Sequence, residues 1–279
     1  PTLLANAGQM DSYGIELAVS GVAYETKDIT WVTTPTISFN RNLITRLSDP
    51  EKGFNYTQTT SGGVGENGIM NTNVQLLTEK EAVGAFYGYS FAGYKSDGTA
   101  MFNTPTGGYI SADNASESHK MIIGNAQPIF TFGWNNTVRY KNWDASVFFR
   151  GVVGNKVLNV TRWAYGPQNS VSTNIFLKDA VGTDVKVVDK GHFTDTYLEN
   201  GSYLKLDNLT VGYNFKLKEN NYIENLRVYF TGQNLFTITG YSGQDPEVNT
   251  TGVWDAGIDY PDFYPTVATI LFGVNMSLK

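Results

Sequence analysis

The last segment of the chain alternates between apolar and polar side chains over an unusually long stretch. From 266 to 279 it reads TVATILFGVNMSLK, and every second residue from Ala268 to Leu278 is apolar. A period of two predicts a β-strand. Strands of soluble domains usually have about 5–6 residues, whereas a tilted strand that crosses a membrane needs roughly 9–11. The segment therefore predicts a transmembrane strand with one face toward lipid and the other toward a wet lumen.

The same alternation predicts six further strands that run back and forth. They are 12–24, 29–46, 128–140, 143–154, 203–217 and 224–238. A few side chains break the pattern. We expect Val32, Phe148, Leu235 and Leu271 on the inner face, and Asn136 on the outer face.

The connections between these strands alternate in length, as they do in outer-membrane barrels. Short turns at 24–29, 140–143 and 217–224 are expected on the periplasmic side, beside the outward aromatic residues Trp31, Tyr140 and Trp143. The long loops 47–127, 155–202 and 239–265 are expected outside the cell. We expect the last two loops to project together, away from the short turns.

The first long loop has an ambiguous interior. Residues 51–80 and 104–127 are predicted to be irregular, because they are rich in Gly, Asn, Thr and Ser. Between them, 82–103 predicts a hairpin that closes near Asp97 and Gly98. This hairpin either lies within the loop or adds two strands to the barrel.

The alternation predicts about seven to nine strands in this chain. Plugged outer-membrane transporters have roughly 22 strands, so the predicted strands are too few to close such a barrel. Bare strand edges in lipid leave unpaired backbone groups. We therefore expect a partial barrel, in which upstream strands of the same protein pair with 12–24 and with 266–278.

Composition argues against several other classes of protein. The chain of 279 residues has a formal charge of −6, which disfavours a nucleic-acid partner. It has no cysteine, so it forms neither disulfides nor thiolate metal sites. No apolar run approaches the length of a transmembrane helix. We expect neither a cofactor nor a metal.

The chain resembles the C-terminal part of the barrel in SusC/RagA-type TonB-dependent outer-membrane transporters of Bacteroidetes. The stretches that carry the resemblance occur in the family's order and span most of the chain. They are YGIEL (13–17), WVTTPTISFNRNLITRLSD (31–49), IIGNAQPIFTFGWNNTVRYKNWDASVFFRGVVGNKVLN (122–159), SYLKLDNLTVGYNF (202–215), RVYFTGQNLFTITGYSGQDPEV (227–248) and GIDYPDFYPTVATILFGVNMSL (257–278).

The resemblance implies that residues 1–279 are an antiparallel transmembrane β-barrel segment with long extracellular loops. The upstream barrel strands, the plug and the TonB box would lie outside this chain. The whole protein would sit in the bacterial outer membrane and act as a nutrient importer, not as an enzyme. It would take up oligosaccharides or peptides with a SusD-like lipoprotein as its lid, and TonB would act through the absent N-terminal part.

Two other functions explain the same patterns. One is a TonB-dependent receptor for siderophores or other nutrients, which would have no lid. The other is a surface β-sandwich that binds carbohydrate, in which a second sheet would bury the residues that the barrel presents to lipid, namely Ile15, Phe132, Phe149, Val211 and Phe272.

Loop aromatic residues are the candidates for substrate binding, because aromatic rings stack on sugars and pack on peptides. They are Trp163, Tyr165, Tyr241, Trp254 and Tyr260. The alternative is that they pack the loops together or contact a lid.

The charged residues expected to face the lumen are Arg139, Asp144, Arg150, Lys216 and Arg227. They would form salt bridges within the lumen or hold the plug, and guiding substrate is a second possibility.

The remaining polar residues give little support for catalysis or metal binding. His119 and His192 are expected to be solvated loop residues. The last long loop carries an acidic group that comprises Asp245, Glu247, Asp255, Asp259 and Asp262. Solubility explains these carboxylates better than a Ca²⁺ site or an acid–base pair, because their spacing matches no EF-hand loop.

Overall fold

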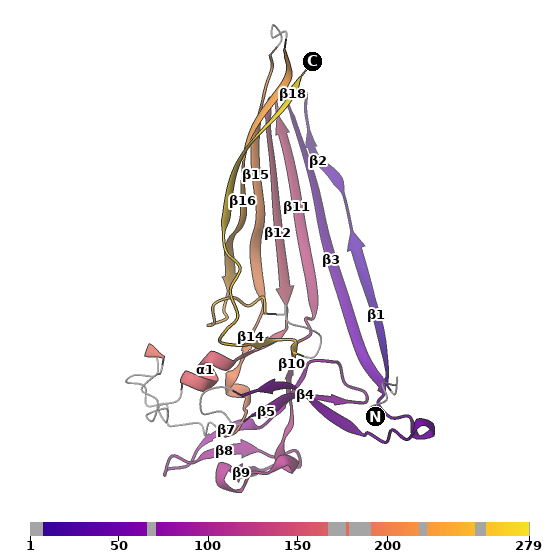
Figure 1. Cartoon of the computed structure of the whole chain (residues 1–279), viewed down its shortest axis with the longest axis vertical. Coiled ribbons are helices and arrows are strands. Elements are labelled where there is room, and N and C mark those ends of the chain that lie inside the picture. The colour runs from indigo at the N-terminus through magenta and orange to yellow at the C-terminus, as the bar shows by residue number, and fades with distance from the viewer. Residues whose placement is uncertain are drawn as a thin grey trace, which may run out of the picture.

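The computed structural model describes residues 8–65, 71–166, 177–178, 191–217, 222–248 and 255–278. Eight strands form one long antiparallel sheet, which we call the wall sheet (Figure 1). Its strands are β1 (Gln9–Ala18), β2 (Gly21–Glu25), β3 (Ile29–Arg46), β11 (Phe130–Tyr140), β12 (Trp143–Val153), β15 (Tyr203–Phe215), β16 (Ile223–Thr239) and β18 (Thr269–Leu278). They lie in the order β1-β3-β11-β12-β15-β16-β18, and β2 also pairs with β3.

The wall sheet contains all seven segments that the alternation predicts, with one correction. The predicted strand 12–24 is two strands, β1 and β2, which both pair with β3. The interruption lies opposite Pro35, since Ala18 pairs with Thr36 and Gly21 pairs with Thr33. Proline has no backbone N–H, so the hydrogen-bond ladder loses a donor at this point.

The other elements form what we call the loop body, at the end of the wall sheet where the long loops emerge (Figure 1). Its strands are β4 (Gln58–Val64), β5 (Thr72–Thr78), β6 (Ala85–Gly88), β7 (Ser90–Tyr94), β8 (Ala100–Asn103), β9 (Tyr109–Ser111), β10 (Met121–Asn125), β13 (Lys156–Asn159), β14 (Leu198–Asn200) and β17 (Ile258–Asp259). The helix α1 (Val160–Tyr165) follows β13 directly. Among the described residues, no helix is both long and apolar enough to cross a membrane.

The loop body corrects the prediction that 51–80 and 104–127 are irregular. Strands β4 and β5 fall in the first segment, and β9 and β10 fall in the second. The 82–103 hairpin exists as β7 and β8, but these strands form a sheet with β9 and not with the wall sheet. Of the two readings left open for this hairpin, the structure therefore favours the loop.

The three long loops share one hydrophobic core. Phe86 from the first loop, Trp163 from the second and Ile258 from the third are all buried in it. The strands β13 and β17 pair in parallel across the last two loops, through Leu158 and Ile258. Those two loops therefore lie together, at the end of the wall sheet away from the short turns at 24–29 and 140–143 (Figure 1).

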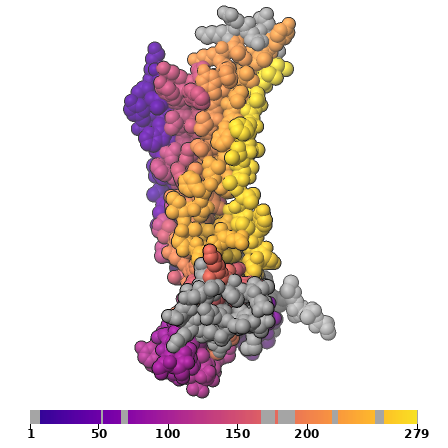
Figure 2. Space-filling model, turned by 90° about the vertical axis from the view of Figure 1, so that its left-hand side faces the viewer, coloured from indigo at the N-terminus to yellow at the C-terminus, as the bar shows by residue number. Residues whose placement is uncertain are grey.

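The outer face of the wall sheet pairs its few polar groups with one another. The indole of Trp31 donates to the Asn136 side chain at 3.0 Å, and the indole of Trp134 donates to Thr33 at 2.8 Å. The outward position of Asn136, an exception in the alternation, therefore gives Trp31 its hydrogen-bond acceptor. Figure 2 shows β16 and β18 as a continuous wall above the loop body.

The predicted inward position of Leu235 is wrong. A bulge in β16 lies between Gln233, which pairs with Asn208, and Phe236, which pairs with Leu206. Asn234 has a φ of 50° within it. A Cβ placed on Gly232 would come within 3.0 Å of the Leu235 side chain, so Leu235 shares the outer face with Gly232. The bulge thus brings Leu235 to the same face as Gly232, three residues earlier, which strict alternation does not allow.

Candidate functional site

The inner face of the wall sheet carries two separate clusters of charged residues. The first lies toward the short turns, where Arg227 donates from Nε and Nη2 to both carboxylate oxygens of Asp144. The Asn214 amide also donates to Asp144, at 2.7 Å. Arg139 lies directly opposite Asp144 in the pairing of β11 with β12. The structure therefore brings together three of the five charged residues that were predicted to share this face.

The second cluster, which we call the anchor network, joins the wall sheet to the last long loop. Arg150 on β12 donates from Nε to Asp207 at 2.6 Å and binds both carboxylate oxygens of Glu247, at 2.7 and 2.8 Å. Lys205 on β15 donates to the same carboxylate at 2.7 Å. Asp245 completes the network by accepting from Thr266, whose hydroxyl in turn accepts from Lys205 at 2.9 Å.

The Lys205 side chain is only 1% exposed. A buried ammonium is strongly destabilising unless anionic and hydrogen-bonding partners surround it. Glu247 and Thr266 supply those partners from the two sides of β17, so the buried charge on β15 ties the segment between β16 and β18 to the sheet. The network thus accounts for Asp245 and Glu247 of the acidic group as partners of Arg150 and Lys205.

The sequence did not reveal Lys205 and Asp207 as members of this network, because a bulge in β15 exchanges which residues point inward and which point outward. Asn208 pairs with Phe148 and Leu206 pairs with Phe149, so Asp207 is an extra residue. Counting every second residue back from Leu209 would place the side chains of both Asp207 and Lys205 on the outer face. Two charges on a face that is otherwise apolar are the signal that could have revealed the bulge.

The anchor network should weaken at acidic pH. Burial opposes ionisation of Glu247, but hydrogen bonds from Arg150 and Lys205 outweigh burial and hold its pKa below the ordinary value of 4.5. The pKa of Asp245 is lowered in the same way, since hydrogen bonds from Thr266 and the Glu247 amide outweigh burial. A carboxyl with a lowered pKa stabilises the fold above its unfolded pKa, and this contribution is lost as pH falls through the folded pKa.

We expect the amides of 241–248 to keep constant protection from hydrogen exchange above about pH 5 and to lose it progressively below that value. Exchange rates should first be corrected for the intrinsic effect of pH. Corrected protection that stays constant down to about pH 3 would contradict the role given to these carboxylates.

The predicted substrate-binding aromatic residues are mostly part of the loop-body core. Trp163 is 0% exposed and lies 5.3 Å from Phe193 between ring centroids. Tyr241 is buried and donates to Asp259, and burial is the main cause that raises the pKa of both groups. The burial of these two aromatic residues leaves them no surface for a substrate in this structure.

The other three predicted aromatic residues differ from these two. Tyr165 and Tyr260 are partly buried against the same core, and Tyr260 donates to the Gly63 carbonyl at 3.0 Å. Both keep some exposed surface. Trp254 lies outside the described residues.

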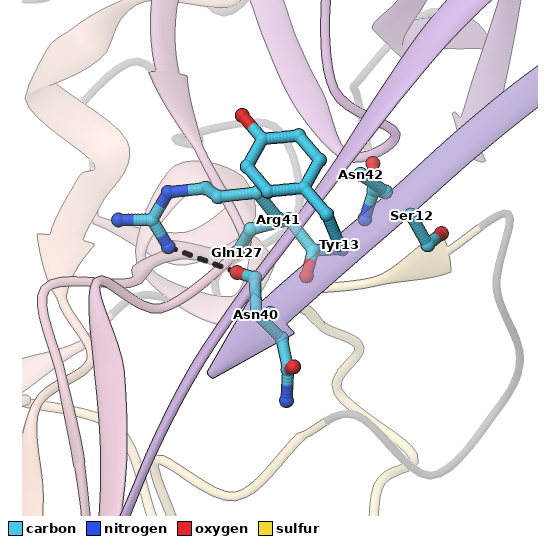
Figure 3. A pocket seen from close by; sticks show the side chains of 7 residues that line it. Ser12, Tyr13, Asn40, Arg41, Asn42 and Gln127 are labelled. Atoms are coloured by element: carbon cyan, nitrogen blue, oxygen red, sulfur yellow. Dashed lines mark hydrogen bonds between the residues drawn. The ribbon is translucent and has the colours of Figure 1, made fainter. Parts of the chain in front are cut away.

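A shallow polar pocket lies where the wall sheet meets the loop body (Figure 3). Arg41 lies at its centre and donates from Nη1 to the carbonyls of Asn40, Pro128 and Ile129, at 2.9 to 3.1 Å. The Asn42 side chain accepts from the Val83 amide at 2.8 Å. Together these bonds hold the first long loop against β3, so this pocket is a structural junction.

No metal centre emerges from the described part of the chain. It contains no group of three or more His, Cys, Asp or Glu side chains that could hold a metal ion. His119 accepts from the Ser116 amide in a local turn, and His192 packs against Tyr89 and Phe102. Asp255 and Asp262 take no part in the anchor network.

Comparison with known proteins shows that the chain is similar in sequence to TonB-dependent receptors. No family model matches the sequence. Over 98% of its length the chain is 33% identical to "TonB-dependent receptor P3" of Formosa agariphila, and over 97% it is 29% identical to "TonB-dependent receptor SusC" of Bacteroides thetaiotaomicron. It spans only 29% and 27% of those two proteins.

Solved structures show the same fold. The chain matches the RagAB peptide transporter with a TM-score of 0.74 and 23% identity, over 97% of this chain and 30% of that one. The RagAB peptide importer in its "open-open" state gives a TM-score of 0.72.

Proposed function

Because this chain is related to the SusC-type TonB-dependent receptors, we propose that it forms the C-terminal barrel part of a TonB-dependent outer-membrane transporter. The wall sheet is the observation that carries this proposal. Its strands keep an apolar outer face and a polar inner face, and its fold is shared with the RagAB transporter. In the whole protein, upstream strands would pair with β1 and β18, and the plug and TonB box would lie upstream of this chain.

The cargo would be oligosaccharides or peptides too large for porins. A SusD-like lipoprotein would close over the loop body, which gathers all three long loops at one end of the wall. Within the loop body, Tyr165 and Tyr260 remain candidates for contact with cargo, because their rings are only partly buried. Asp144 and Arg227 would face the lumen, where their ion pair would stiffen the wall or hold the plug. Arg139 lies opposite Asp144 at the short-turn end of the wall.

The exposure of the outer face favours a barrel wall over a carbohydrate-binding sandwich. A sandwich would cover this face with a second sheet, but Ile15 is 73% exposed and Phe272 is 81% exposed. This exposure shows that no described strand covers these two residues. Lipid would cover them in the barrel.

Extraction from cells tests the proposal directly. We expect the protein that carries this chain to be found in the outer-membrane fraction and to require detergent for release. Recovery in a soluble fraction without detergent would exclude the barrel. The receptor without a lid is tested separately, by gentle purification from detergent extracts. A SusD-like lipoprotein that co-purifies in about equal amount supports the transporter, and its absence supports the receptor.

A further inference from the structure

A basic cleft lies at the short-turn end of the wall sheet, opposite the loop body. Its volume is about 720 Å³. Lys27 and Asp28 come from the turn between β2 and β3, Lys141 comes from the turn between β11 and β12, and Lys216 follows β15. Three connections that are far apart in the sequence therefore build one surface.

The charge of this cleft is opposite to that of the chain. Its lining contains four cations, Lys27, Arg139, Lys141 and Lys216, and one carboxylate, Asp28, which gives a formal charge of 4 − 1 = +3. The whole chain carries −6. None of the four cations forms a salt bridge with a described residue. The Lys141 ammonium lies 5.3 Å from the centre of the Tyr140 ring, and the carboxylate of Asp144, opposite Arg139, is already held by Arg227 and Asn214. Cations that converge on one cleft without carboxylate partners indicate an anionic ligand.

Backbone hydrogen bonds hold the cleft in shape. The Lys141 amide donates to the Asp28 carbonyl at 2.8 Å, which joins the first turn to the second. The Asn214 amide donates to the Asn142 carbonyl at 2.9 Å, which joins the second turn to the end of β15. A ligand that binds here needs little rearrangement of the backbone, so less of its binding energy is lost to ordering.

Aromatic residues border the same cleft on the outer face of the wall. Tyr140 is 47% exposed and Trp143 is 52% exposed, and the Trp143 ring lies 4.8 Å from that of Tyr213. Exposed Trp and Tyr next to an apolar strand surface are typical of the boundary between lipid tails and headgroups. The cations therefore lie at the depth where a lipid phosphate would be, which favours a lipid over an acidic protein segment.

We propose that this cleft binds the phosphate of an anionic phospholipid headgroup, with the lipid tails lying along the outer face beyond Tyr140 and Trp143. The proposal rests on the barrel placement given above. Lysines supply long-range attraction and direct phosphate contact. The tightly joined turns would keep the bound lipid at the rim of the wall.

Lipid titration of the intact protein in mild detergent, followed by native mass spectrometry, tests this site. The probes are phosphatidylglycerol and the zwitterionic phosphatidylcholine. We expect phosphatidylglycerol to bind more tightly. The triple variant Lys27→Gln, Lys141→Gln, Lys216→Gln should lose roughly a hundredfold of that affinity, because each lysine near an anionic lipid contributes about fivefold. The matched control makes the same change to glutamine at three lysines of the loop body, Lys80, Lys95 and Lys178. It should bind phosphatidylglycerol as tightly as the unmodified protein does.

Three results would overturn the proposal. Equal affinity for the two lipids would show that the headgroup charge is not recognised. Equal losses in the two triple variants would show only a general charge effect. Inorganic phosphate that binds as tightly as phosphatidylglycerol would remove the role of the lipid. The barrel itself is judged by detergent-dependent extraction, which does not depend on these lysines, so the two proposals can fail separately.

Discussion

Replacing Phe272 by arginine should destabilise the protein by about 2–4 kcal/mol, because in the proposed barrel it would place a cation on the face toward lipid. Phe272 is 81% exposed on the outer face of β18, and its ring lies 5.4 Å from that of Phe230 on the neighbouring strand. The free energy of unfolding in urea, measured for protein refolded into phospholipid vesicles, gives the size of the effect.

The control for this variant is Thr269→Arg on the same strand. Thr269 pairs with Gln233 on the inner face, where water and other polar groups can solvate a guanidinium. We expect this second variant to lie within about 1 kcal/mol of the unmodified protein, as is usual for exposed sites. Equal destabilisation by the two arginines would show that the faces of β18 have been assigned wrongly.

Replacing Glu247 by alanine should release the last long loop from the wall sheet. The change leaves the buried Lys205 ammonium without its closest carboxylate, since the remaining one on Asp245 lies 3.9 Å away. Breaking a buried ion pair by removing one partner typically costs about 3–5 kcal/mol. Hydrogen exchange of the amides in 241–248 should therefore become faster by roughly two to four orders of magnitude, because each 1.36 kcal/mol corresponds to about tenfold.

An ion pair whose carboxylate is exposed provides the control. Glu117 is 80% exposed and pairs with Lys120 at 2.6 Å. The Lys120 side chain is only 11% exposed, but its ammonium keeps its contacts with the Tyr87 and Tyr89 rings, so Glu117→Ala should change stability by less than about 1 kcal/mol. The double variant Glu247→Gln, Lys205→Met removes both buried charges and should recover much of the lost protection. A double variant as damaged as Glu247→Ala would show that the buried charge is not the cause.

The wall sheet could be predicted from the sequence because one physical condition acts along each of its strands. A face such as that of Ile270 and Phe272 is apolar at every second residue, and this period can be read without knowing any neighbour. The alternation predicted that Asp144 and Arg227 share one face, and in the structure they form an ion pair. The same alternation gave the wrong face for Lys205, because a single extra residue in β15 exchanges the inward and outward positions beyond it.

The loop body could not be predicted in the same way. Gln75 is fully buried, and its amide donates to the carbonyl of Ala256, which is 181 residues away. Trp163 packs against Phe193 and Tyr197, which lie 30 and 34 residues further along the chain, in a core that the other two long loops share. Nothing in its own stretch of sequence distinguished a core residue from a ligand-binding one. Burial of this kind depends on which distant segments meet, and short-range periodicity does not contain that information.

The division of the loop body among three separate segments also constrains the order of assembly. Its first sheet is made before β11, but the pairing of Leu158 with Ile258 and the bond from Gln75 to Ala256 must wait for residues that follow β16. Contacts between such distant residues form slowly, because a long stretch of chain has to be ordered first. The surface offered to a partner at that end is therefore complete only after seven of the eight wall strands have been made. A partner that recognises the finished loop body would thereby distinguish a mature protein from one still being assembled.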